Sequence, residues 1–392
     1  MGISIGLVGL GAFGSEFAPL FKHHPLVDRV ALYDQEPEKI RKFSEDPSFQ
    51  DKFSASDVYE TLDDICRADL DALAIITQPW LHAPQAVQAM EAGKDVYSAV
   101  PVMCVPDGGE ILEWCDKIIE TSRRTGQLYM LGETTLYRCE SMYCRRRARE
   151  GAFGAFVYAE GEYLHPYDSP GCDLREVMKH RTTGKVGREW QALRQKYRDR
   201  NVPDSPMHYP THSVSGPLDV MNTYAKKVCC WGFKRLAGDD FFDDSLYSNE
   251  TALFQLANGA TLRLNEYREL GHPGVETFRV FGTEGSFADN AWLDKKQSAP
   301  LATEDMRDPL PPEVVDAFRK GLNRGDDFFG GHGGSHAYLV HEFVDAVAHH
   351  RTPYINAWKS ARYMAAGVTA HQSALKDGEI IEVPDWGDAP VG

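Results

Sequence analysis

Short apolar runs alternate with longer amphipathic segments through the first third of the chain. Runs of this length, apolar throughout, are typical of strands that are buried on both faces of a parallel sheet. The segments between them have helical spacing, with glycine or proline near their ends. This alternation predicts an α/β domain with a doubly wound parallel sheet over residues 1–135. The expected strands are 3–8, 30–34, 71–77, 95–98 and 128–131, and the expected helices are 15–24, 36–45, 82–91 and 106–124.

The pattern changes beyond about residue 150, where longer runs of strand-like composition follow one another. Asn258-Gly259 between two of them is a hairpin signal. We therefore predict that residues 136–392 form an α+β domain with a mostly antiparallel open sheet, used for substrate binding and oligomerisation. Residues 168–206 are polar and rich in charge, and we expect an irregular surface excursion that could serve as a substrate lid. The expected strands are 156–164, 228–236, 251–257, 260–268, 275–281 and 380–383, and the expected helices lie near 140–150, 207–224 (bent at Pro217), 311–324, 336–350 and 358–376.

A glycine motif, G-x-G-x-x-G, directly follows the first predicted strand. Its glycines make a tight turn, let the backbone approach a pyrophosphate and let a helix pack closely on the strand, and the helix N-terminus favours the anion. Asp34 ends the second apolar run, where a carboxylate accepts hydrogen bonds from ribose hydroxyls and repels a 2′-phosphate. A glycine-rich turn in another α/β fold would leave Asp34 unexplained. We predict bound NAD rather than NADP, held by Gly9, Gly11, Ala12, Phe13, Gly14 and Asp34.

Composition and charge narrow the possible partners and the compartment. The formal net charge of -16 disfavours nucleic acids and anionic membranes. No apolar run approaches the ~20 residues of a membrane span, and the chain starts directly with a strand rather than a signal peptide. The eight cysteines include the pair Cys229-Cys230 but no C-x-x-C, which favours reduced thiols in the cytoplasm. We predict no metal site, because the spacing of the nearest candidates matches no ligand rule: His165, Asp168, Cys172, Asp173 and His180.

At this point the chain resembles the glucose–fructose oxidoreductase / inositol dehydrogenase family (Gfo/Idh/MocA). The resemblance rests on the layout of the two domains, on Thr77-Gln78-Pro79 with the nearby His82, and on Pro101 at a later strand end. It implies that Thr77, Gln78, His82 and Pro101 contact the cofactor. Family members carry Glu-Lys-Pro where this chain has Ala99-Val100-Pro101, and their lysine handles the proton during hydride transfer at a sugar carbinol. Valine cannot do so, and the ordinary dehydrogenase site is therefore broken here.

A narrower resemblance, over residues 93–219, is to the NAD-dependent α-N-acetylgalactosaminidases, which also lack the lysine and carry Glu-Val-Pro. Ala99 departs from this branch, where glutamate is usual. The shared motifs are Tyr129-Met130 followed by Glu133, the segment 159–165 (Ala-Glu-Gly-Glu-Tyr-Leu-His), and Tyr209-Pro-Thr-His212 followed by Gly216-Pro217. The resemblance implies that Glu133, Tyr163, Tyr209 and His212 line the reacting sugar. A spacing of three places Tyr209 and His212 on one side of a helical turn.

These residues suggest a chemical route. NAD can take a hydride from a ring carbinol, provided that a base receives the hydroxyl proton. The candidate bases are His212, which titrates nearest neutrality, and Tyr163 and Tyr209, which would need a lowered pKa. Oxidation at C3 would acidify the C2 hydrogen, so that a base could remove it and expel the C1 substituent. Addition of water and return of the hydride would complete glycoside hydrolysis with NAD recycled, while Glu133 holds a sugar hydroxyl.

Other functions stay open at this stage. A sugar or polyol dehydrogenase could use Tyr209 and His212 in place of lysine and give net oxidation. A non-catalytic sugar or dinucleotide sensor would also tolerate the loss of the lysine. In each case the partner is a small sugar or glycoside, and the family implies a homodimer or homotetramer.

Three further features have competing interpretations. His82 either contacts the cofactor or caps a helix. The glycine- and histidine-rich loop 330–336 either closes the sugar site or forms the first turn of a helix, with Ser335 as its N-cap. The run of arginines at 145–147 is expected on a solvated helix face.

Overall fold

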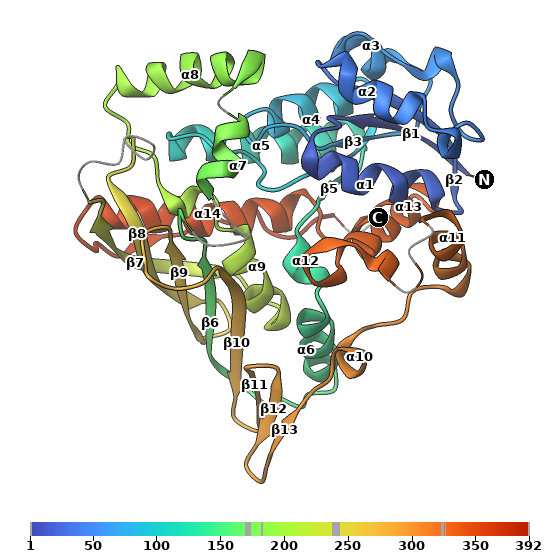
Figure 1. The fold of residues 1–392 in the computed structure, drawn as a ribbon. Helices are drawn as coiled ribbons and strands as arrows, with labels where there is room; N and C mark the ends of the chain where they lie inside the picture. Colours follow the sequence, from blue (N-terminus) through green and yellow to red (C-terminus); the bar gives the residue numbers. More distant parts are fainter. Residues whose placement is uncertain are drawn as a thin grey trace.

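The computed structural model describes residues 2–168, 174–181, 183–236, 244–322, 325 and 327–390. Two sheets organise these residues, one in each half of the chain (Figure 1). In the described part of the chain, no helix combines the length and the apolar character that crossing a bilayer requires.

The first sheet has five parallel strands in the order β2-β1-β3-β4-β5, which confirms the predicted doubly wound α/β architecture. Short helices lie beside the first crossovers: α2 (Pro37–Ser44), α3 (Leu62–Arg67) and the 3-10 turns Pro47–Phe49 and Ala55–Asp57. The strands are β1 (Ile3–Val8), β2 (Val27–Tyr33), β3 (Ala72–Ile75), β4 (Asp95–Ser98) and β5 (Tyr129–Leu131), and the main helices are α1 (Ala12–His23), α4 (His82–Glu91) and α5 (Gly108–Thr125). Because all five strands run the same way, their carboxyl ends meet at one edge of the sheet.

The second sheet has nine strands in the order β13-β12-β11-β10-β6-β9-β8-β7-β14, antiparallel except for the parallel pair β6–β9. Strands β11, β12 and β13, which lie together at one end of the sheet, are absent from the sequence expectation. The strands are β6 (Phe156–Leu164), β7 (Ala225–Lys234), β8 (Tyr247–Leu256), β9 (Thr261–Tyr267), β10 (Val275–Gly282), β11 (Gly285–Ala288), β12 (Ala291–Asp294), β13 (Ser298–Pro300) and β14 (Ile381–Glu382).

Helices cover one face of the second sheet and connect it to the first (Figure 1). Helix α9 (Thr211–Val220) packs on β6 and β10, and α14 (Ala357–Ala374) packs on β7 and also on α5 and β5 of the first half. The remaining helices are α6 (Cys139–Arg149), α7 (Leu174–Arg181), α8 (Gly184–Arg198), α10 (Thr303–Met306), α11 (Pro312–Leu322), α12 (Gly331–Gly334) and α13 (His336–Ala348), with 3-10 turns Thr134–Tyr137 (η3), Pro206–His208 (η4) and Asp327–Phe329 (η6). The boundary at residue 135 stays a prediction.

The segment predicted to be irregular, 168–206, contains two helices instead, and this expectation was wrong for its described residues. Charged residues hide the amphipathic pattern of α8, where Val186, Trp190 and Tyr197 are buried on one side. Trp190 stacks on Trp80, with ring centroids 4.4 Å apart. Tyr197 donates a hydrogen bond to Glu110 of α5 at 2.8 Å. These contacts attach the excursion to the first half of the chain.

The run of arginines at 145–147 is not the solvated face that we expected. Arg145 is 8% exposed and donates to the Leu136 carbonyl at 2.6 Å and to Asp219 at 3.3 Å. Arg147 lies over the ring of Trp292. Burial of the first arginine is possible because Asp219 neutralises its charge, a partner 74 residues away that no local pattern indicates.

One helix start and one helix cap also differ from expectation. The helix predicted at 207–224 begins only at Thr211, after the 3-10 turn of Pro206–His208, and ends at Val220. Tyr209 therefore precedes α9 instead of lying within it. Ser335 has helical dihedral angles, and its side chain caps no N–H group of α13 among the described residues, because its hydroxyl is buried against the preceding loop.

Candidate active site

The glycine motif forms the turn between β1 and α1, and its three glycines meet different constraints. Gly9 has φ +92°, and a Cβ there would collide with the Ile76 carbonyl oxygen. A Cβ on Gly14 would collide with the carbonyl oxygen of Gly9. A Cβ on Gly11, the N-cap of α1, would meet no described atom within 4 Å. The fold itself therefore requires Gly9 and Gly14, whereas Gly11 keeps space open where the N–H groups of α1, from Ala12 on, begin.

Asp34 follows β2 and lies beside this turn. Its carboxylate accepts hydrogen bonds from the backbone N–H groups of Leu10 at 2.7 Å and of Glu36 at 2.8 Å. The side chain is 9% exposed and fixed in orientation by these two bonds. Each carboxylate oxygen keeps a further lone pair for a ribose hydroxyl. The open space at Gly11 and the fixed acid together fit the pyrophosphate and ribose of a dinucleotide.

Of the strand-end residues assigned to the cofactor, His82 and Thr77 already bond to other parts of the protein, whereas Gln78 keeps an acceptor free within the described part of the chain. His82 is buried, and its two ring nitrogens face the carbonyl oxygens of Pro101 at 2.8 Å and Thr77 at 3.3 Å. It braces the ends of β3 and β4 rather than capping a helix. The Thr77 hydroxyl donates to Gln85 of α4 at 2.6 Å. The side-chain oxygen of Gln78 is buried and has no hydrogen-bond partner among the described residues, so that it offers an unused acceptor at this edge.

A histidine–carboxylate pair occupies the junction of the two halves. The Nδ1 atom of His212, at the start of α9, lies 2.9 Å from Oε1 of Glu133, which follows β5. Glu133 is fully buried and also accepts from the backbone N–H of Thr135. A direct contact of Glu133 with sugar, as the sequence suggested, does not fit its place behind the imidazole. The carboxylate instead fixes the ring of His212 and its proton.

Tyr163 lies beside this pair in a row across three neighbouring strands. The sheet register places it opposite Glu276 of β10 on one side and Glu266 of β9 on the other. Its ring centroid is 5.0 Å from that of His212, and its hydroxyl lies 2.8 Å from Nδ1 of His165. Period-two alternation turns all three side chains of the row toward α9.

Tyr209 completes the group of rings and reaches the first half of the chain. Its hydroxyl donates to the carbonyl oxygen of Val100 at 3.2 Å, next to the cis peptide bond before Pro101. Its ring centroid lies 5.5 Å from that of His212 and 6.4 Å from that of Tyr163. The phenol therefore lies at the strand end where the sequence lacks a lysine.

Burial and charge set the protonation states at this site. Burial alone would lower the pKa of His212, but the charges of Glu133 and Glu276 outweigh it and raise that pKa to about 9. Burial raises the pKa of Tyr163 well above its ordinary value, so that this phenol stays protonated and acts as a hydrogen-bond donor. The expectation of a tyrosine with a lowered pKa is wrong for Tyr163. Burial also raises the pKa of Glu266 to about 7.

The raised pKa of His212 predicts a pH-dependent stability. Since the folded protein holds this proton more tightly than the unfolded chain, the contribution is complete below pH 6.5 and is lost as the pH rises through about 9. We expect the melting temperature to fall over this window, and to fall less in His212→Gln, which cannot titrate. Thermal unfolding from pH 6 to 10 measures both slopes. Equal slopes in the two proteins would contradict the assignment.

The sequence analysis did not identify Glu276 or Glu266 as site residues. Each is the charged member of an apolar alternation, after Leu262 and Leu264 in one strand and before Phe278 and Val280 in the other. An acid on the core face of a strand is a usable signal, because burial of a charge requires a partner. Here Glu266 accepts from Ser213 at 2.5 Å, which ties the sheet to the start of α9.

The glycine- and histidine-rich loop also belongs to the site, through His332 of α12. The N–H of Gly331 donates to Nδ1 of His336 at 3.3 Å, and Nε2 of His336 lies 3.0 Å from Nδ1 of His332. Burial lowers the pKa of both imidazoles, that of His336 to about 3, which keeps them neutral. This relay leaves the proton of His332 on Nε2. The His332 ring packs edge-on against Phe13 of the glycine motif, and the charges of the His212 group act on its pKa.

The atoms of Glu133, His212 and Glu276 lie within 4.8 Å of one another and could in geometry hold a metal ion. Existing hydrogen bonds give a simpler account. Glu133 accepts from His212 and Thr135, and Glu276 accepts from the Thr135 hydroxyl at 2.5 Å and pairs with Arg138 at 3.2 Å. His212 and Arg138 balance the two negative charges, while Oε2 of Glu133 is buried without a hydrogen-bond partner among the described residues. The absence of a metal therefore stays a prediction, which now also covers the cluster of Glu133, His212 and Glu276. Of the metal candidates named from the sequence, Cys172 and Asp173 lie outside the described residues.

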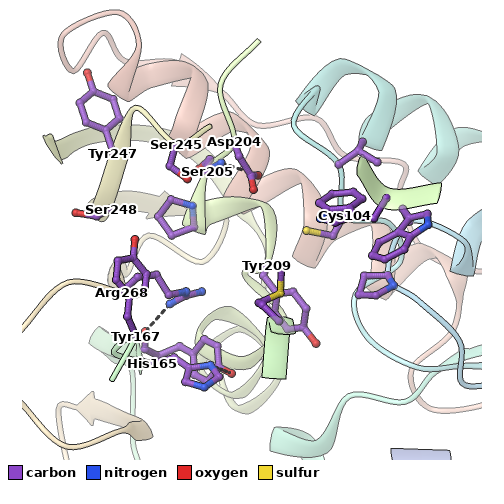
Figure 2. A pocket seen from close by; sticks show the side chains of 17 residues that line it. Cys104, His165, Tyr167, Asp204, Ser205, Tyr209, Ser245, Tyr247, Ser248 and Arg268 are labelled. Carbon is purple, nitrogen blue, oxygen red and sulfur yellow. Dashed lines mark hydrogen bonds between the residues drawn. The ribbon is translucent and has the colours of Figure 1, made fainter. Parts of the chain in front are cut away.

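A cavity is lined by both phenols, Tyr163 and Tyr209. Figure 2 shows Tyr209 at its centre, with Cys104 of the first half on one side and Arg268 and His165 of the second half on the other. The cavity therefore lies between the carboxyl edge of the first sheet and the ends of β6, β8 and β9. It is the place next to the proton-carrying groups where a ligand has room.

Comparison with known proteins agrees with this geometry. Residues 3–133 match the Gfo/Idh/MocA oxidoreductase family, NAD-binding Rossmann fold. The chain is 25% identical to glycosyl hydrolase family 109 protein 1 of Bacteroides thetaiotaomicron over 98% of this chain and 84% of that protein. It is 28% identical to the alpha-N-acetylgalactosaminidase of Shewanella oneidensis over 98% of this chain and 85% of that protein.

Among solved structures, the fold is shared with scyllo-inositol dehydrogenase of Lactobacillus casei with bound NAD(H) and scyllo-inositol. The TM-score is 0.64 at 16% identity, and the match covers 97% of this chain and 99% of that one. The family match confirms the predicted family and its NAD-binding domain for residues 3–133, and the solved structure confirms the α/β fold. The chain is an oxidoreductase-type enzyme with glycosidase homologues.

Proposed function

We propose that this chain, whose residues 3–133 form an NAD-binding domain of the Gfo/Idh/MocA family, hydrolyses a glycoside by oxidation and elimination. The observation that carries the proposal is the replacement of the expected lysine by Val100, with the Tyr209 phenol at its carbonyl and the paired His212 beside it. An alpha-N-acetylgalactosaminidase among the relatives makes an N-acetylgalactosaminide the first substrate to test.

NAD bound along the glycine motif supplies a hydride acceptor for a ring carbinol and returns the hydride at the end of the cycle. The Gly9–Gly14 turn, Asp34 and the acceptor of Gln78 would hold it. All remaining steps depend on side chains that hold or move protons. The two halves of the chain supply them from opposite sides of the cleft.

His212 exchanges the proton of the sugar hydroxyl through Nε2. Its Nδ1 atom is occupied by Glu133, which keeps the ring oriented and stabilises the imidazolium. The positive charge of a bound oxidised nicotinamide would lower the pKa of the His212 imidazole toward neutrality. The imidazole would then accept the hydroxyl proton. Glu133 is accordingly a positioning residue, and His212 is the base.

Tyr209 is the group best placed to remove the acidified ring proton, because it lies at the edge of the first sheet beside the expected nicotinamide position. It would act as the phenolate, after its hydroxyl proton has passed to solvent, and the phenol formed by taking the ring proton would then protonate the departing oxygen. Burial keeps the Tyr163 phenol protonated, and this phenol donates a hydrogen bond to the sugar ring. The neutral His332, whose ring packs against Phe13, would donate a hydrogen bond from Nε2–H to the departing oxygen without giving up the proton. Removal of the ring proton and departure of the C1 substituent leave an unsaturated ketone, to which water adds.

Incubation with an aryl N-acetylgalactosaminide in deuterated water tests this route. We expect deuterium at C2 of the released sugar and no stoichiometric build-up of NADH, because the hydride returns in each turnover. NADH accumulating with each product molecule would instead identify a net dehydrogenase. Hydrolysis without deuterium at C2 would contradict the elimination step.

We also propose that two copies pair through the face of the second sheet that α9 and α14 do not cover. Trp231, Phe233 and Leu253 are about half exposed on this face, beside the ion pairs of Glu160 with Arg279 and of Glu162 with Arg263. An exposed apolar patch rimmed by charges is typical of an interface. Light scattering that reports a monomer at micromolar concentration would contradict the pairing.

The seven described cysteines are free thiols, and Cys115, Cys144 and Cys230 are buried. This pattern supports a reducing compartment, and we propose the cytoplasm. Cell fractionation that recovers the protein outside the cytoplasm would contradict this location.

A further inference from the structure

The cavity beside Tyr209 has a wall made by the helical excursion. Trp190 of α8 and Trp80, which precedes α4, stack with ring centroids 4.4 Å apart and 18° between their planes. Both rings are buried, and Met178 of α7 lines the same cavity. The wall thus combines a residue of the first half with two residues of the excursion.

The opposite side of the cavity is also rich in rings. Tyr167 and Tyr247 line it (Figure 2). Tyr163 and Tyr209, which also line the cavity, connect it to His212 through their ring contacts. A ligand that reaches from His212 past these phenols enters a space with aromatic side chains on both sides. Stacking on flat faces is the contact such walls offer.

Most polar groups of the cavity already have partners within the protein; among its described lining residues, the Ser248 hydroxyl and the Trp190 indole N–H are buried without one. The Arg268 guanidinium donates to Glu266 at 2.9 Å and to the Tyr163 carbonyl at 3.3 Å. The hydroxyl of Ser205 donates to Glu250 at 2.5 Å. A ligand with many hydroxyl groups would therefore lose its bonds to water here without gaining equivalent ones.

We propose that this cavity binds the leaving group of the glycoside and that this group is an apolar ring rather than a second sugar. The proposal rests on the proposed function for the position of the reacting sugar, which lies next to His212. The apolar ring then extends toward Trp190, so that α7 and α8 determine leaving-group specificity. A leaving group that buries its ring against these walls gains the hydrophobic contribution that a small alcohol cannot.

Benzyl and methyl glycosides of one sugar provide the test, because their leaving alcohols have similar acidity and differ in the apolar ring. We expect kcat/KM to be at least about tenfold higher for the benzyl glycoside. Trp190→Ala should reduce this ratio toward one, and Trp190→Phe, which keeps a ring, should preserve most of it. Trp114→Ala, a half-buried tryptophan on α5 away from the cavity, should leave the ratio unchanged.

A binding measurement separates this proposal from the proposed reaction. Phenol alone should quench the tryptophan fluorescence of the wild-type protein saturably, and the Trp190→Phe variant should respond more weakly. If no glycoside is hydrolysed but phenol still binds in this way, the proposed function fails and the aromatic site stands. A benzyl-to-methyl ratio near one, or a disaccharide processed more efficiently than the benzyl glycoside, would overturn the leaving-group assignment.

Discussion

Replacing His212 by asparagine is expected to lower kcat about 100- to 10,000-fold while NAD binding is retained. Nδ1 of the imidazole is committed to Glu133, and the proposed route uses Nε2 to accept the proton of the reacting hydroxyl. Asparagine keeps a polar side chain at the start of α9 but cannot exchange a proton near neutral pH. Single-turnover formation of NADH from the glycoside measures the oxidation step directly. Calorimetric titration with NAD checks that the first half of the chain is unaffected.

His371→Asn is the matched control. His371 of α14 forms the same kind of pair, buried and 2.9 Å from Oε1 of Glu250. Both substitutions leave a buried carboxylate without its imidazole and are expected to cost similar stability. If the two variants lose turnover equally, the effect of His212 is structural and its role as the base is refuted.

Gly11→Asn is expected to abolish most cofactor binding without harming the fold. Gly11 has φ -65°, which any residue adopts, and asparagine is a preferred N-cap, so that α1 should start as before. The added side chain occupies the open space and competes for the N–H groups of α1. Losing two hydrogen bonds to a charged phosphate, at about 1.5 kcal/mol or more each, weakens NAD binding about 100-fold. Calorimetric titration with NAD measures the dissociation constant.

Substitutions at two other glycines serve as controls for Gly11→Asn. Gly151→Asn also places a side chain in open space, at φ +71° that asparagine tolerates, and should bind NAD normally. Gly9→Ala should fail to fold, because of its positive φ and the Ile76 carbonyl. A melting temperature of apo Gly11→Asn well below that of the wild type would show that Gly11 serves the fold instead of the ligand.

The sequence was most informative where the chemistry is local. The Gly9–Gly14 spacing and the apolar run ending at Asp34 are set by neighbouring residues, and the first sheet is parallel and doubly wound as predicted. The Tyr209-Pro-Thr-His212 motif likewise reached its place at the cleft, although α9 starts two residues after Tyr209. Local steric and hydrogen-bonding rules act within such short segments, which is why a pattern reports them.

The features that the sequence could not predict depend on contacts between residues far apart in the chain. Glu276 reaches Thr135 across 141 residues because β10 pairs with β6, and Asp219 buries Arg145 across 74. The role of Glu133 changed for the same reason: only the tertiary packing of α9 against η3 places it behind an imidazole. The charged residues of α8 hide its apolar side in the sequence. The structure shows that side packed on the first half of the chain, where Trp190 stacks on Trp80.

Helix α14 has a consequence for the order in which the molecule is assembled. It begins at residue 357, yet its side chains pack on α5 and β5 as well as on β7. During synthesis on the ribosome, the apolar flank of the nucleotide-binding half stays uncovered until Ala357–Ala374 have emerged. Completion of the first half therefore waits for the translation of these residues, more than 200 positions after β5, and the nascent chain is open to chaperone binding over that interval.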